Sequence, residues 1–542
     1  MKQKTTLRLI LIFIGLTLLL AACGGEDEPE PTPILPPANI SVGGEDGNSE
    51  GVVESGELPA VDEPVNTPIS LPATPTLAVT ATAEPTVAPT PITDPASLQV
   101  VTSGSMPPSS RDLLFLADGA FKRWNHGSQS VETLVPGPDP ATRVRAEDGI
   151  FVNDFVGDIT DYSVSEDGKR AVFARLTYSQ PITRTGTSNG ESFEFPDIDQ
   201  QSELYFMDLV SNQTWLIVPR VDKLGDFALS DDAQHLAFVG ASLNGTPAFD
   251  EGGNPIPNMY FLPTGGGNAG SVKSVAQCKA FCSQVAWHPD NNLFAFSDNT
   301  AVWLQNLAAD APEVLIENRP FFAATQDLGD IAVYSPIDWA NNGRFLLMWK
   351  GGWEGGNRAV FDVPTKALQD VPDTFSYAEL FSTEVMWMPD DRLYVLRSQG
   401  DANIVPQIEL WRFQPDQNSI VKEESLVLSD QPVGAAGQQY LENGRFAYVL
   451  MNFDGQHTAS GIYHLTSLSE QPERVNDASP IGYGAYALWP TDGSGVIIAA
   501  QNNGGSQQIY YGPVGGTSLF DVTAMMGAEL SHFQWQPEIL LP

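Results

Sequence analysis

The sequence predicts an all-β fold, a β-propeller built from four-stranded antiparallel blades. One observation is an internal repeat, in which a strand ending in a large residue, a polar turn and a second apolar strand recur after residue 160. Another is the turn chemistry, because Asp-Gly and Asn-Gly pairs supply the positive φ angles that tight hairpins require. The third is that helical periodicity is almost absent beyond residue 110. Four antiparallel strands in each ~50 residues are typical of one propeller blade.

The amino terminus has the pattern of a targeting segment and not of a folded element. Basic residues precede the apolar run 9–20, which at ~1.5 Å per residue hardly spans a ~30 Å hydrocarbon core. The run ends in Leu20–Cys23, which resembles the lipobox of bacterial lipoproteins. The resemblance implies that residues 1–22 are a signal peptide, that Cys23 is lipidated, and that the chain lies on the extracytoplasmic side of a membrane in the cell envelope. An ordinary secretory peptide with an incidental cysteine is the alternative.

Residues 23–110 have the composition of a tether. Positions 24–110 hold 16 prolines and 13 Asp+Glu, but no Lys, Arg or aromatic residue. Such a stretch buries too little apolar surface to offset its chain entropy, and its like charges and Thr-Pro steps extend it. We therefore expect a disordered acidic spacer that holds the domain at 111–542 away from the membrane.

The repeat is in register over the whole domain. Each inner strand ends in a large anchor residue, and successive anchors lie 46 to 65 residues apart. The anchors are Val164, Leu229, Trp287, Trp339, Trp387, Leu441, Trp489 and Trp535. Behind each hairpin lies a third strand, such as 203–209 or 258–264, and then a weaker fourth one.

The two ends of the domain are expected to complete one blade together. Three strand-like pieces, 113–118, 120–125 and 131–136, have no inner strand before them, and one spare inner strand follows the last full blade around Trp535. Pairing of these terminal strands would close the ring and give eight blades. A ring of seven blades is the alternative.

The turns allow the family of folds to be named. Trp-x-Pro-Asp at 287–290 and 387–390, and Ser-x-Asp-Gly at 165–168, resemble the blades of TolB-type, WD-repeat-like β-propellers. The resemblance covers about 110–542 and implies that the tryptophans pack between blades. It implies little about function, because propellers host many unrelated activities.

Several classes of function are disfavoured by the residues present. With 67 Asp+Glu against 27 Lys+Arg, the net charge of −40 argues against nucleic-acid binding. A Gly-x-Ser-x-Gly string at 186–190 is not followed by the helix that a nucleophile elbow needs, and the six histidines show no ligand spacing. We therefore expect no catalytic residues, no metal, no cofactor and no enzymatic activity.

Cys278 and Cys282 flank three residues in a connection between blades. A zinc site would need two further ligands nearby, and an oxidising exterior favours disulfides. We expect a disulfide that closes this short loop, with a free thiol pair as the alternative.

The longest connections are predicted on one face of the ring, because B–C and D–A connections of a blade leave the same end. They are 136–158, 177–201, 241–257 and 317–333, and loops on a rigid scaffold are where binding residues usually lie. Aromatic and acidic residues in these loops and in the B–C loop of the fifth blade form the candidate binding set. Its members are Phe193, Phe195, Asp197, Asp199, Phe249, Asp250, Glu251, Phe321, Phe322, Trp353 and Glu354. The alternative is that these aromatics only pin long loops to the ring.

These observations together favour a monomeric, lipid-anchored binding module that presents one loop-rich face to a protein, peptide or glycan. An envelope-assembly scaffold is a second interpretation, as the TolB-like blades would suggest, although the amino-terminal domain of that family has no counterpart in this sequence. A propeller hydrolase of glycans or peptides is a third, and a pair of acids near the ring axis would favour it.

Overall fold

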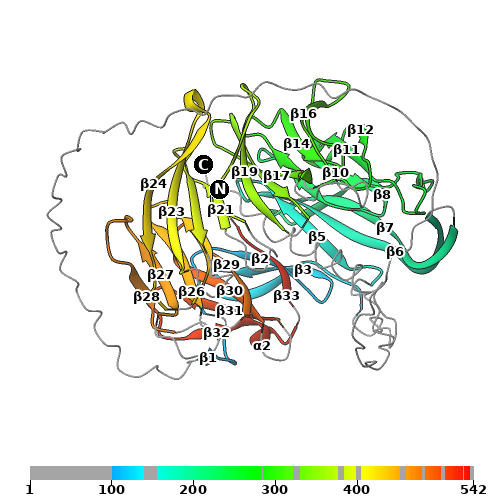
Figure 1. The fold of residues 1–542 in the computed structure, drawn as a ribbon. Helices are drawn as coiled ribbons and strands as arrows, with labels where there is room; N and C mark the ends of the chain where they lie inside the picture. The colour runs from blue at the N-terminus through cyan, green and yellow to red at the C-terminus, as the bar shows by residue number, and fades with distance from the viewer. Residues whose placement is uncertain are drawn as a thin grey trace, which may run out of the picture. The chain divides into compact units, whose positions relative to one another are not determined.

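The protein is an eight-bladed β-propeller, as predicted (Figure 1). The computed structural model describes residues 100–105, 107–139, 155–188, 191–283, 285–320, 330–353, 355–375, 384–397, 405–431, 433–451, 459–478, 483–501, 507–528 and 530–536. These residues belong to one compact unit. None of its helices is long and apolar enough to cross a membrane.

Each blade is an antiparallel sheet of four strands that runs from an inner strand to an outer one. In this order, the first four blades are β33 (Leu530–Trp535), β2 (Leu113–Ala117), β3 (Ala120–Asn125), β4 (Ser130–Val135); β5 (Ile159–Val164), β6 (Arg170–Ser188), β7 (Glu191–Asp208), β8 (Gln213–Asp222); β9 (Phe227–Leu229), β10 (His235–Gly240), β11 (Asn258–Pro263), β12 (Lys273–Gln277); and β13 (Ala286–Trp287), β14 (Leu293–Ser297), β15 (Ala301–Asn306), β16 (Glu313–Glu317).

The remaining blades repeat this order. They are β17 (Val333–Trp339), β18 (Phe345–Gly351), β19 (Gly356–Asp362), β20 (Ala367–Asp370); β21 (Glu384–Trp387), β22 (Leu393–Arg397), β23 (Gln407–Gln414), β24 (Ser419–Val427); β25 (Gly434–Tyr440), β26 (Phe446–Met451), β27 (Gly461–Leu465), β28 (Glu473–Asn476); and β29 (Tyr483–Leu488), β30 (Gly495–Gln501), β31 (Gln507–Pro513), β32 (Leu519–Asp521). Short helices lie at Gly265–Gly267, Pro415–Gln417 and α2 (Val522–Met526).

The terminal strands close the ring, as the sequence predicts. β33 pairs antiparallel with β2, with Trp535 opposite Leu113 and Leu530 opposite Ala117. A buried apolar cluster lies between each pair of neighbouring blades, and the cluster that joins the eighth blade to the first contains Trp535 and Phe533.

Four of the five tryptophan anchors are hydrogen-bonded to the blade before them, whereas the buried Trp489 Nε1 has no hydrogen-bond partner among the described residues. The indole N–H of Trp287 donates to the carbonyl oxygen of Ala228 at 3.0 Å. Trp339 makes the equivalent bond to Ala286 at 3.1 Å, Trp387 bonds the preceding inner strand at 3.3 Å, and Trp535 does so at 2.9 Å. A buried indole needs a partner for its N–H. The same contact therefore supplies apolar burial and a satisfied donor at four blade interfaces.

The hairpin turns have the backbone that their glycines predict. Gly168, Gly343, Gly444 and Gly493 have φ between 67° and 80°, where a Cβ atom is disfavoured. At Gly343 a Cβ would also lie 2.3 Å from the His288 ring of the neighbouring turn. Glycine is required there both by conformation and by space.

Two segments differ from the sequence-based expectation. Residues 177–201, expected as a loop, continue β6 and β7 as a two-stranded ribbon that is paired as far as Ser188 and Glu191 (Figure 1, cyan). Val100–Val101, which by composition belongs to the tether, forms β1 and pairs in parallel with β32. Residues 1–99, including the expected lipidation site Cys23, lie outside the described part.

Candidate functional site

The extension of β6 and β7 forms a projecting hairpin, which we call the arm (177–188 with 191–201). The arm contacts the connection between β10 and β11, which we call the buttress loop (241–257). Thr187 donates to the carbonyl oxygen of Glu251 from its backbone N–H at 2.9 Å and from its hydroxyl at 2.8 Å. The two backbones approach so closely that a Cβ on Gly186 would lie 2.1 Å from the oxygen of Gly252. The arm is thus held in place by main-chain contact with the next blade.

The pairing register places four predicted residues on one side of the arm. Side chains alternate along a strand, so Phe193, Phe195, Asp197 and Asp199 share a side, on which Arg184 of β6 lies opposite Phe195. The rings of Phe193 and Phe195 are 5.8 Å apart.

The buttress loop adds an aromatic ring to this side of the arm. The Arg184 guanidinium lies 4.9 Å from the ring centroid of Phe249, within cation–π range. Phe193 remains 43% exposed and Phe249 47% exposed. The loops therefore bring together aromatics from two blades and leave part of each ring at the surface.

An ion cluster fixes the base of this aromatic group. Asp197 accepts hydrogen bonds from Arg184 at 2.5 Å and from the Lys223 ammonium at 2.8 Å, and Asp199 lies 3.7 Å from Arg184. Burial alone raises the pKa of Asp197, but these hydrogen bonds outweigh it and hold the pKa below its usual value. The cluster is therefore charged at neutral pH and orients Arg184 beneath Phe249.

Asp250 and Glu251 lie in the buttress loop but serve its shape. The carboxylate of Asp250 accepts the backbone N–H of Asn254 at 2.8 Å, which closes the turn between them. Glu251 contacts the arm through its carbonyl oxygen. Their contacts are thus those of loop-forming residues.

The other predicted residues fall elsewhere. Trp353, 55% exposed, lies between β18 and β19 of the fifth blade, away in sequence and blade order from the arm. Phe321, Phe322 and Glu354 lie outside the described residues. Phe375, just after β20, is 53% exposed and was not among the residues expected from the sequence.

The exposed aromatics share one face of the ring. Within the described ranges, the Phe and Trp side chains that are most exposed are Phe193, Phe249, Trp353 and Phe375, and all four belong to B–C or D–A connections. Exposed aliphatics are spread more widely: Val156 and Val405 lie in connections on this face, others lie on outer strands, and Val210 and Val514 lie in C–D turns at the opposite end of the blades.

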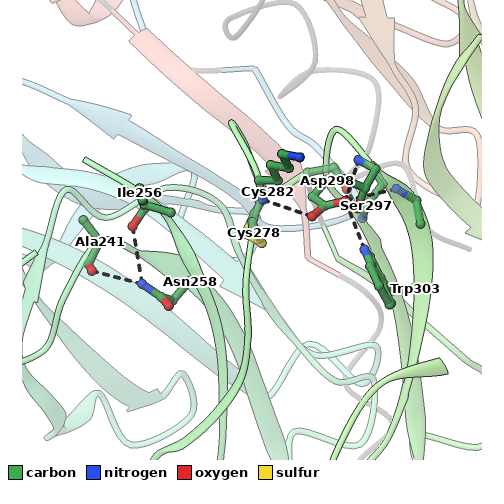
Figure 2. The surroundings of a disulfide bond; sticks show 12 residues. Ala241, Ile256, Asn258, Cys278, Cys282, Ser297, Asp298 and Trp303 are labelled. Carbon is green, nitrogen blue, oxygen red and sulfur yellow. Dashed lines mark hydrogen bonds between the residues drawn. A yellow bond between two sulfur atoms is a disulfide. The ribbon is translucent and has the colours of Figure 1, made fainter. Parts of the chain in front are cut away.

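A disulfide lies beside the carboxyl-terminal end of the buttress loop (Figure 2). Cys278 and Cys282 are bonded to each other, and the Cys278 backbone N–H donates to Pro257 at 2.9 Å, where the loop ends. The loop is also tied by the Asn258 amide, which donates to Ala241 at 3.1 Å and Ile256 at 3.3 Å. The cysteine bridge thus lies on the same face as the arm.

Asp298 holds the other side of this bridge. It accepts the Lys279 backbone N–H at 3.0 Å and the Trp303 indole N–H at 3.1 Å (Figure 2). Burial alone raises the pKa of Asp298, but hydrogen bonds from Thr300, Lys279 and Trp303 bring it below its usual value. A charged carboxylate therefore anchors the disulfide loop to the fourth blade.

A second group of polar residues, the axial set, was not recognised from the sequence. Successive inner strands contact one another around the ring axis, for example β5 with β9 and β21 with β25. The residue three positions before each anchor is polar in every blade but one, where it is Pro336. The axial set is Asp161, Asp226, Gln284, Glu384, Gln438, Tyr486 and His532. The signal was present in the repeat, at a fixed distance from the anchors.

Members of the axial set meet across blade interfaces. His532 Nε2 lies 4.0 Å from Asp161 Oδ1, and Glu384 accepts the Gln438 backbone N–H at 3.1 Å. Burial raises the pKa of Glu384, although the N–H groups of Gln438 and Gly437 oppose the shift. Gln284 lies outside the described residues.

The structure bears on two chemical features considered from the sequence, the Gly-x-Ser-x-Gly string and a metal site. The Gly-x-Ser-x-Gly string lies at the tip of the arm, where β6 ends at Ser188 and β7 starts at Glu191, so a strand follows it and not a helix. Over the residues that the structure describes, no group of three or more His, Cys, Asp or Glu side chains could hold a metal ion.

Comparison with known proteins leaves the family open. No protein-family model matches the chain, and no curated protein matches it either. Among solved structures, it is similar to Porphyromonas gingivalis dipeptidyl peptidase 4 at 12% identity and a TM-score of 0.44, covering 75% of this chain and 58% of that one. This chain thus spans a little over half the length of that peptidase.

Two further structures are also similar at low identity. TolB from Acinetobacter baumannii is 14% identical with a TM-score of 0.29, covering 67% of this chain and 84% of TolB. The periplasmic gluconolactonase PpgL of Pseudomonas aeruginosa is 13% identical with a TM-score of 0.37, covering 79% and 99% of the two chains.

One prediction needs correction in the light of these neighbours. The sequence led us to expect no enzymatic activity. That prediction is wrong, because a peptidase and a gluconolactonase are among the structures to which the chain is similar. Their identity to this chain is too low to transfer any reaction. The fold is compatible with an enzyme as well as with a binding protein.

Proposed function

We propose that this chain is a binding module that takes a protein, peptide or glycan on the surface formed by the arm and the buttress loop. We further propose that Cys23 carries a lipid and holds the module on the extracytoplasmic side of a membrane. The observation that carries the binding role is the pair of half-exposed rings, Phe193 and Phe249, packed beside the charged Arg184–Asp197 pair.

The exposure and order of this surface support a binding role over that of a pinned loop. A loop that merely covers the ring would bury its aromatics, whereas these two rings keep 43% and 47% of their surface in water. Partly exposed aromatics beside an oriented guanidinium offer apolar contact, cation–π contact and hydrogen bonding at one place. The main-chain contacts of Thr187 and the ion cluster keep this arrangement ordered before a ligand arrives, which lowers the entropy cost of binding.

Charge narrows the class of ligand. The net charge of −40 repels polyanions, attracts cationic partners and leaves neutral partners unaffected. A neutral glycan or an uncharged to basic peptide segment fits the arm better than an acidic polymer does.

The chain enters the propeller at the end of the blades opposite the arm, which supports a membrane-anchored protein whose arm points away from the membrane. Arg111 pairs with Glu442 and with Asp492, each at 3.4 Å, and both acids lie in turns between the first and second strands of their blades. These turns are at the opposite end of the blades from the arm. A lipid anchor amino-terminal to Val100 would therefore approach the ring from the side away from the proposed binding surface.

The binding role can be tested with matched surface variants of a Cys23→Ser chain. The immobilised protein is exposed to envelope extract and to a glycan array. A ligand retained by the parent should be retained at least tenfold less by Phe193→Ala/Phe249→Ala, because each aromatic anchor contributes about 1–2 kcal/mol. Val210→Ala/Val514→Ala, which alters exposed apolar residues at the other end, should retain it fully. Equal retention by the arm variant would refute the proposed surface.

A further inference from the structure

The closing strand places a serine and a histidine next to an acid of the neighbouring blade. In β33, the Ser531 hydroxyl oxygen lies 3.0 Å from His532 Nδ1. The other ring nitrogen, Nε2, lies 4.0 Å from Asp161 Oδ1 of β5. Ser531 is exposed, whereas the His532 and Asp161 side chains are 22% and 21% exposed. A hydroxyl, an imidazole and a carboxylate therefore lie next to one another where the inner strands of the first and second blades meet.

The backbone departs from regular pairing here, as it also does between the first and second strands of four other blades. Between Leu114 and Leu116 of β2 the register shifts, so that an extra residue of β33 bulges from the ladder. His532 has φ of +54°, a left-handed conformation that is uncommon for residues other than glycine. The Tyr162 hydroxyl donates to the carbonyl oxygens of Leu114 at 2.8 Å and of His532, and so holds the bulge. Among the inner strands that the structure describes, His532 is the residue other than glycine with a positive φ, and such strained residues concentrate near functional sites.

The nearby carboxylate also favours the tautomer that the chemistry needs. A carboxylate near Nε2 favours a proton on that nitrogen, which leaves Nδ1 to accept the Ser531 O–H. Nucleophilic serine catalysis requires a hydroxyl beside a base, and a third group that orients the base. Ser531, His532 and Asp161 supply these three groups, with Asp161 at an ion-pair distance of 4.0 Å from Nε2 and with the two ring nitrogens exchanged relative to the usual serine triad.

We propose that Ser531 is the nucleophile of a carboxylic-ester hydrolase site, with His532 as general base and acid and Asp161 as its positioning residue. The Ser531 oxygen bonds to the ester carbonyl carbon while its proton passes to His532 Nδ1. The C–O bond to the alcohol then breaks, and the alcohol leaves with that proton. Water attacks the acyl-serine, gives its proton to His532, and the acid departs as Ser531 regains the proton.

The surroundings indicate which esters fit. Asp226 and Glu384 stand at the equivalent position of other inner strands, and carboxylates around one axis disfavour an anionic substrate. The substrate class is therefore an uncharged or cationic ester. This site lies on inner strands and not on the arm, so it is independent of the proposed binding surface.

The test is covalent labelling of the full chain with an uncharged alkyl fluorophosphonate, which forms a serine–phosphorus bond and releases fluoride. We expect labelling at Ser531, identified by mass spectrometry of the digested protein. Ser531→Ala should abolish it, and Ser128→Ala, a change at another exposed serine, should leave it unchanged. No labelling of the folded parent, or labelling that persists in Ser531→Ala, would overturn the proposal.

Two variants separate the roles of the partners. His532→Asn should lower the labelling rate about 10²-fold or more, while asparagine tolerates the left-handed backbone and preserves the bulge. Asp161→Asn should lower the rate and alter its pH profile, whereas a merely structural role would change the melting temperature and leave the profile intact. If both variants melt like the parent and label at the parent rate, the assignment is wrong.

Discussion

Trp535 is expected to be the residue on which closure of the ring depends most. It is the anchor of β33, only 8% exposed, and packs in the cluster that joins the eighth blade to the first. Its indole N–H donates to Leu488 at 2.9 Å, and its ring lies 6.1 Å from that of Tyr511. Trp535→Ala would remove both the apolar contact and the hydrogen bond across this interface.

The expected magnitude follows from these contacts. Truncating a buried aromatic costs about 3–5 kcal/mol, and leaving the Leu488 carbonyl without its donor adds up to about 1 kcal/mol. Trp535→Ala should therefore lower the free energy of unfolding by about 3–6 kcal/mol, a large part of the ~5–15 kcal/mol of a folded domain. Trp535→Phe keeps most of the apolar contact and should cost about 1–2 kcal/mol.

Urea unfolding followed by circular dichroism measures these differences. The matched control is Trp353→Ala, the same change at a side chain that is 55% exposed, which should alter the free energy of unfolding by no more than about 0.5 kcal/mol. If Trp535→Ala unfolds within about 1 kcal/mol of the parent, well short of the cost of truncating a core aromatic, the terminal strands do not hold the ring closed.

Three further predictions concern other parts of the chain. Cys23→Ser should abolish labelling by a fatty-acid analogue and release the protein from membranes; an unlabelled parent would refute the lipid anchor. Burial, aided by the Arg445 charge, lowers the pKa of His464 from 6.5 to about 4. Between these two pH values the unfolded chain binds a proton at His464 that the folded chain does not bind. The contribution of His464 to the free energy of unfolding is therefore full above pH 6.5 and falls by about 3 kcal/mol as the pH decreases to 4. In His464→Phe, urea unfolding across this range should show a correspondingly smaller loss, and an unchanged slope would contradict the assignment. Cys278→Ser/Cys282→Ser should lower the free energy of unfolding by about 2 kcal/mol and speed amide hydrogen exchange in 241–257, with exchange in 203–209 as the control. Equal protection of 241–257 in the variant and the parent would show that the disulfide does not support the buttress loop.

The blade architecture could be predicted because its signals are local and repeated. The anchors from Val164 to Trp535 and the Asp-Gly or Asn-Gly turns each specify a hairpin, and eight of them in register leave few other folds. Ring closure was also predictable, since the spare strand around Trp535 and the strands after residue 112 complete one sheet only together.

The parts that were missed depend on tertiary partners. Residues 177–201 contain Pro181, Pro196 and many polar residues, so they lack a strand pattern; the ribbon forms because β6 and β7 pair with each other and rest on Gly252. Val100–Val101 is too short to predict a strand without β32 beside it. Phe375 is a lone aromatic in a loop, and nothing local distinguishes an exposed ring from a buried one.

The candidate site was therefore predicted in part. The structure brings Phe193, Phe195, Asp197 and Phe249 of the expected set together with Arg184, which was not among the expected residues; that they bind a ligand stays a prediction. The axial set was overlooked because the anchors and turns dominate the repeat, although its members occupy a fixed position relative to the anchors.

The most direct test of the binding role is photocrosslinking in cells that produce the protein. A benzoylphenylalanine at position 193 places the reactive group on the arm, and the same residue at position 210 places it at the opposite end of the blades. The proposed function predicts a discrete crosslinked species from position 193 that is absent from position 210 and lost when Phe249→Ala is added. Crosslinks that are equal from both positions, or absent from position 193, would contradict it.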